Sequence, residues 1–210
     1  MNEKSKFSLT QYKDERIVAL VKKTGHKTLA VWAIGCVMRV LPYFEEKNPE
    51  DHRPRTAIET LRTWITSGVF KIGCIPPVYL AGGHAGATGE IHSCQHARRR
   101  APCAERASRQ SMTGGGCEHV DMAVIRKASL DAHAAAREVG EDNAARSAAR
   151  AAGQAVATAH VPAHSIGAAI YALQAIHRAS NPSDAGANIA KERDWQLAHL
   201  RKLLERIKQH

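Results

Sequence analysis

Residues 141–161 read EDNAARSAARAAGQAVATAHV, a stretch dominated by alanine. Alanine has the highest intrinsic helix propensity, and its small side chain allows neighbouring helices to approach closely. Glu141, Asp142 and Asn143 suit a helix N-terminus, where side-chain oxygens accept hydrogen bonds from free backbone N–H groups. Gly140 suits the end of the helix before it. The stretch therefore predicts two successive helices that meet at Gly140.

The segments towards the C-terminus continue the helical pattern. After Pro162, residues 163–179 are again rich in alanine, and the Ser-Asp pair at residues 183–184 suits the start of a last helix. Four apolar residues at helical spacing give this last helix one apolar face, namely Leu197, Leu200, Leu204 and Ile207. Two further helices are therefore expected in this part of the chain.

Two helices are also predicted in the N-terminal third. Residues 29–44 place apolar side chains at three- and four-residue spacing, and Pro42 predicts a kink or an end near that position. Residues 58–65 repeat the spacing after Pro54, which suits the first turn of a helix. We expect an all-α, single-domain bundle of about six alanine-rich helices, because alternating strand patterns are absent from these segments.

Residues 72–121 differ from the rest of the chain. They are rich in Gly and Pro, lack helical periodicity, and hold four of the five cysteines and four of the 12 histidines. An irregular loop of this length is rare inside a compact domain, so we interpret it as an insertion. We expect one helical domain over residues 1–210, with its core in residues 10–71 and 122–208.

Six potential metal ligands lie within the insertion, namely His92, Cys94, His96, Cys103, Cys117 and His119. Their spacing does not match the paired cysteines of a zinc knuckle, and no C-x-x-C occurs. An insertion without its own function is the favoured interpretation, with a metal site and a partner-binding loop as the alternatives. We expect no cofactor and no bound metal.

The net charge of +10 is concentrated at the two ends of the chain. Residues 1–27 carry seven Lys or Arg and three acidic residues, and residues 191–210 carry six and three. Nucleic acid is a less favoured partner, because aromatic residues make up only 5% and the charge is not gathered in one segment. The charged N-terminus is unlike a secretory signal, and no apolar run is long enough to span a membrane, so we expect a cytoplasmic protein.

Several segments outside the insertion resemble one bacterial family. They are W-A-x-x-C at 32–36, VLPYFEE at 40–46, DHRPRTAIET at 51–60, DAHAAARE at 131–138, AGQAVATAHVPAHSIGAAIYAL at 152–173 and ERDWQL at 192–197. Together and in this order they resemble the bacterial immunity proteins with an Imm-5-like domain. The resemblance implies a helical, cytoplasmic, non-enzymatic protein that neutralises a toxin. It brings no catalytic residues with it.

His160 and His164 are the first candidate site, joined by His133. Two histidines four residues apart can share one helical face, as zinc ligands do. However, Pro162 lies between them and leaves the carbonyl of Thr158 without its helical N–H donor. We therefore expect a partly buried polar cluster in which these rings satisfy freed carbonyls or bridge helices. A metal site and a pocket for a ligand or partner remain alternatives.

His52, Arg53 and Arg55 are the second candidate site. They lie at the predicted start of a helix, where cationic side chains and backbone N–H groups can hold an anion. Local ion pairs at a solvated helix start are the simpler interpretation. A contact with an anion or a protein partner is the alternative.

The favoured function is direct binding of a cognate toxin, without catalysis. A helical nucleic-acid-associated protein that uses its basic ends is one alternative. A metal- or ligand-binding protein that uses the histidines is another. No G-x-S-x-G or phosphate-binding glycine loop is present to support an enzyme.

Overall fold

The computed structural model describes residues 13–67 and 120–209. In these two ranges every regular element is a helix, which confirms the predicted all-α class. The helices are α1 (Glu15–Val21), α2 (His26–Met38), α3 (Pro42–Glu45), α4 (Arg53–Thr66), α6 (Met122–Glu138), α7 (Ala144–Ala157), α8 (His164–Ala179) and α9 (Ala185–Lys208). Six of them have 13 to 24 residues, while α1 and α3 are short.

Local sequence sets several helix boundaries. Asn143 caps α7 by accepting a hydrogen bond from the backbone N–H of Arg146 at 3.0 Å. Gly140 ends the segment before it with φ of 76°, a left-handed conformation that glycine adopts without steric cost. Pro42 begins α3 after α2 has ended at Met38, as its missing N–H and fixed φ require.

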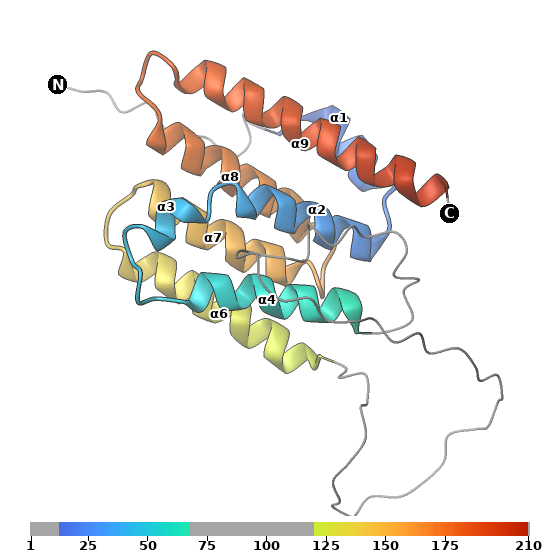
Figure 1. The fold of residues 1–210 in the computed structure, drawn as a ribbon, viewed down its shortest axis with the longest axis horizontal. Helices are drawn as coiled ribbons and strands as arrows, with labels where there is room; N and C mark the ends of the chain where they lie inside the picture. The colour runs from blue at the N-terminus through green and yellow to red at the C-terminus, as the bar shows by residue number, and fades with distance from the viewer. Residues whose placement is uncertain (1–12, 68–119, 210) are drawn as a thin grey trace, which may run out of the picture.

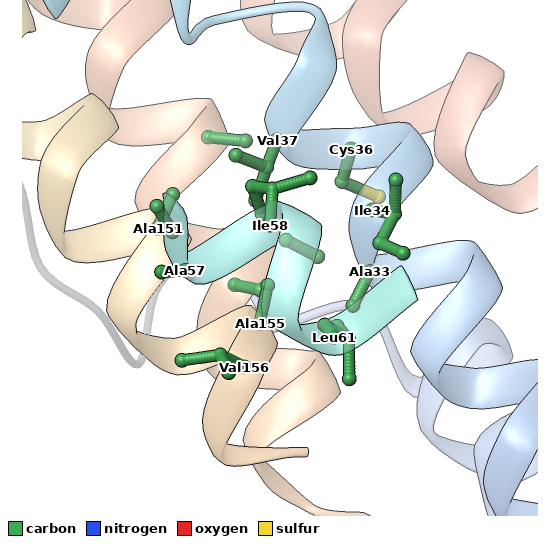
Figure 2. Packing of buried hydrophobic residues seen from close by; sticks show 14 of the residues in the cluster. Ala33, Ile34, Cys36, Val37, Ala57, Ile58, Leu61, Ala151, Ala155 and Val156 are labelled. Carbon is green, nitrogen blue, oxygen red and sulfur yellow. The ribbon is translucent and has the colours of Figure 1, made fainter. Parts of the chain in front are cut away.

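Helix α7 is the centre of the bundle. It contacts α2, α3, α4, α6 and α8 (Figure 1). Most residues of α7 are buried, and most of these are alanines, whose small side chains allow several helices to pack closely against α7. Figure 2 shows Ala151 and Ala155 of α7 beside Ile58 of α4, in the layer where α2, α4 and α7 meet. Small side chains on α7 thus bring its neighbours close together.

Helix α2 is buried all round. Every residue from Thr28 to Val37 is buried, because α2 contacts α4, α7, α8 and α9. The indole N–H of Trp32 donates to the carbonyl of Gln196 in α9 at 2.9 Å. This bond joins the two helices inside the core.

Helices α6 and α9 form opposite edges of the bundle (Figure 1). Helix α9 contacts α1, α2 and α8, while α6 contacts α4 and α7. Helices α4 and α6 run antiparallel, since Arg53 at the start of α4 pairs with Glu138 at the end of α6. No helix in the described residues has the length and apolar character needed to span a membrane.

Candidate functional site

The carbonyl of Thr158, at the C-terminus of α7, receives a hydrogen bond from a histidine. The donor is Nε2 of His26, the first residue of α2. Pro162 cannot supply the usual helical N–H to this carbonyl, so the imidazole replaces it. The prediction that His160 or His164 supplies the donor is wrong, because the turn after Thr158 carries both rings elsewhere.

The first turn of α2 also closes the end of α4. Lys27 donates from Nζ to the carbonyls of Ile65 at 2.9 Å and Ser67 at 3.0 Å. The rings of His26 and Trp64 are in contact, with centroids 5.1 Å apart. A cation at a helix C-terminus is favourable because the last carbonyls carry partial negative charge. One turn of α2 therefore holds the ends of both α4 and α7.

His164 is oriented by α7. Its Nδ1 lies 2.8 Å from Oε1 of Gln154, and an amide oxygen only accepts, so Nδ1 is the donor in this hydrogen bond. Gly167 makes room for this glutamine, since a Cβ at that position would lie 2.7 Å from Oε1. The ring of His160 packs against that of His164 at a centroid distance of 5.2 Å.

His133 lies on α6 against the backbone of α7. A Cβ added at Gly153 would lie 2.8 Å from Nε2 of His133, so the glycine allows this approach. Burial lowers the pKa of His133, and the nearby positive charges of Arg150 and Arg137 lower it further. Burial also lowers the pKa of His160. Both rings therefore favour the neutral form at pH 7.

The structure brings the three predicted histidines to one side of α7. His133 and His164 are partly buried, as expected of a polar cluster. His160 is exposed, which differs from that expectation, because it lies in the turn beyond the C-cap Thr158. The described residues contain no group of three His, Cys, Asp or Glu side chains placed to hold a metal ion.

Arg53 and Arg55 form ion pairs within the chain. Arg53 donates to Asp51 at 2.7 Å and also pairs with Glu138 of α6. Arg55 makes two hydrogen bonds of 2.7 Å to Glu45 of α3. His52 is exposed beside them at the start of α4. These pairs tie α3, α4 and α6 together.

A second polar cluster, at the C-terminal end of α2 and on α9, was missed by the sequence analysis. Buried Glu192 accepts from Nε of Arg39 at 2.7 Å, and burial raises the pKa of this carboxyl group. The guanidinium of Arg39 lies 4.2 Å from the ring of Trp195, which stacks on His199 at 4.8 Å. The available signal was the ERDWQL motif, which places an acid and a tryptophan three residues apart on one helix.

Cys36 is buried next to this second cluster. Burial and the nearby charge of Glu192 raise the pKa of its thiol well above the ordinary value, so it is a poor nucleophile. The Cys and His residues predicted to form a constellation within 92–119 lie outside the described residues.

Fold and site together define a helical bundle whose polar clusters are held by hydrogen bonds and ion pairs between helices. The family model described as "Imm-5 like putative immunity protein" matches residues 19–72 and 116–203. The chain therefore belongs to this immunity protein family, and an insertion splits the match. Neither the comparison with curated proteins nor that with solved structures gives a match.

Proposed function

We propose that this chain is a cytoplasmic immunity protein that neutralises a bacterial protein toxin by binding it directly, without catalysis. Membership of the Imm-5 like family, matched over well more than half of the chain, carries the proposal. Immunity by binding requires a preformed surface whose shape and charge complement the toxin.

The described polar groups favour binding over chemistry. His26 and His164 are engaged in hydrogen bonds within the fold, and the buried Cys36 thiol has a raised pKa. Hydrogen bonds within the fold restrain His26 and His164, and side chains that are already restrained lose little conformational entropy when a partner docks. We accordingly propose a structural role for His133 and His164, with His160 reaching the surface.

His52, Arg53 and Arg55 are a second proposed contact area for the partner. Arg53 and Arg55 already hold carboxylates of their own chain. To bind a partner's carboxylate, each arginine must share or release the one it holds, which reduces the gain. We therefore rank this area below the surface around His160.

Co-expression in a sensitive bacterium tests the proposal. The toxin gene is sought beside the gene for this protein, and the toxin it encodes is induced with wild-type protein, with an unrelated helical protein of similar charge, or alone. We expect growth only with the wild-type protein. Equal killing in all three cultures, with the wild-type protein folded and abundant, would contradict the proposed function.

A further inference from the structure

One surface joins α6 to the turn between α7 and α8. It is formed by Arg126, Leu130, His133, His160, Val161 and His164, and is called here the histidine face. The rings of His160 and His164 are in contact, and His133 of α6 and His164 of α8 lie against the adjacent residues Gly153 and Gln154 of α7, so the two segments are close together. Leu130 lies four residues after Arg126 and three before His133, which places all three on one side of α6.

The charge on the histidine face has one sign. Burial is the main cause of the lowered pKa of His133 and of His160, and nearby arginines lower both further: Arg150 and Arg137 act on His133, and Arg126 acts on His160. The arginines near these two rings are thus a source of positive charge on this side of the bundle. Arginine stays protonated at all physiological pH values, so the face keeps its positive potential. The nearby Asp131 is paired with Lys127 at 2.6 Å.

The histidine face also exposes large apolar side chains. Leu130 is 64% exposed and Val161 is 41% exposed. Within the described residues only two other large apolar side chains are comparably exposed, Val124 and Ile207. Apolar groups flanked by basic ones fit a protein partner better than nucleic acid, whose backbone offers charge and whose bases call for aromatic stacking.

We propose that the histidine face is the toxin-docking surface and that it receives an acidic region of the toxin. Carboxylates of the toxin pair with Arg126 and with Arg137, an exposed arginine four residues after His133 on α6, while Leu130 and Val161 cover apolar side chains of the toxin. The exposed ring of His160 donates to the same carboxylates. This inference rests on the proposed function.

The basic side of α9 is the natural control surface. Arg201 and Ile207 lie on α9 at the opposite edge of the bundle from α6, and both are exposed. They match Arg126 and Leu130 in side-chain chemistry. The two pairs therefore differ in position while their changes of charge and apolar area are alike.

The test compares two double variants in their affinity for the purified toxin identified in the co-expression experiment. The first is Arg126→Glu with Leu130→Ser, and the control is Arg201→Glu with Ile207→Ser. All four side chains are exposed, so both proteins should fold, which circular dichroism and thermal melting verify. We expect the first variant to bind at least about 100-fold more weakly than wild type, and the control within about threefold.

The outcomes separate the two proposals. If wild-type protein does not bind the toxin, the proposed function itself fails. If wild type binds and both variants bind equally well, the function stands and the histidine face is overturned. A duplex DNA oligonucleotide at 150 mM salt is tested in the same way. If wild type binds this DNA and the first variant does not, the histidine face recognises nucleic acid, which also overturns the inference.

Discussion

His26, at the start of α2, donates a hydrogen bond to the carbonyl of Thr158, at the end of α7. The residues are 132 positions apart in the chain. Pro162 removes the local donor from this carbonyl, so a distant imidazole completes the helix end. The bond fixes the start of the turn that carries His160 and Val161, and so links core packing to the histidine face.

Replacing His26 by alanine should destabilise the protein by about 1–3 kcal/mol, because a helix-end carbonyl loses its donor. Contact with the Trp64 ring is lost as well. The matched control is His52→Ala, at an exposed position, which should change stability by less than about 0.5 kcal/mol. Urea denaturation followed by circular dichroism measures both. Equal effects would show that the His26 bond contributes nothing.

Replacing Gly35 by alanine should destabilise the fold although alanine favours helix by about 1 kcal/mol. The added Cβ would lie 2.9 Å from Cδ2 of His199, whose ring is buried and stacked on Trp195. Overpacking of this kind costs about 1–3 kcal/mol. Gly186→Ala in α9, with nothing within 4 Å, should instead be neutral or stabilising. Thermal melts that shift in the same direction for both variants would contradict the packing at Gly35.

Stability should fall on acidification through the titration of His199. Burial, with Lys202, Arg206 and Arg39 nearby, lowers the pKa of this ring from 6.5 to about 4. Between pH 4 and pH 6.5 the unfolded chain binds more protons than the folded one. The contribution of His199 to the free energy of unfolding is therefore complete above pH 6.5 and is lost as the pH falls towards 4. The slope is at most about 1.4 kcal/mol per pH unit.

His199→Gln isolates this effect. Burial raises the pKa of the Glu192 carboxyl group, so this group makes the free energy of unfolding larger, not smaller, as the pH falls. The lowered pKa values of His133 and His160 act like that of His199 and reduce the free energy of unfolding in acid. The variant keeps these other groups, so the difference between the two pH profiles of unfolding free energy reports His199 alone. Parallel profiles between pH 4 and 6.5 would rule out the lowered pKa.

Deleting residues 73–115 should leave a folded helical protein. The family match ends at residue 72 and resumes at 116, and α4 and α6 run antiparallel, so the end of α4 and the start of α6 lie on the same side. Loop closure depends weakly on length, at about 0.6 kcal/mol per doubling, so a short connection should suffice. A cooperative thermal melt near that of the full chain is expected. A broad melt without cooperativity would place the segment in the core.

Much of the fold was predictable because helix ends depend on nearby residues. Pro42, Gly140 and Asn143 act through their own backbone or side chain, and their positions as boundaries are confirmed. Periodicity was less decisive along α9. Leu197 and Leu200 are buried as predicted, but Leu203 is buried in place of Leu204, and Ile207 is exposed. The spacing alone leaves open whether the third or the fourth residue faces a neighbour.

The polar clusters were harder to predict. The Arg39–Glu192 pair and the His26–Thr158 bond join residues more than 130 positions apart. Each depends on which helices become neighbours, and no local pattern encodes that. The sequence did indicate that the carbonyl of Thr158 needs a donor, because Pro162, four residues later, has no N–H to offer it. Which histidine meets it is decided by the packing of α2 on α7.

The central claim is that this protein neutralises its toxin by binding and not by chemistry. A titration of purified toxin with rising amounts of this protein, followed by the intact mass of toxin recovered under denaturing conditions, tests it directly. We predict that toxin activity falls in proportion to added protein, reaches zero at a fixed stoichiometric ratio, and leaves the toxin mass unchanged. Complete loss of activity at amounts far below stoichiometric, with a changed toxin mass, would contradict the account.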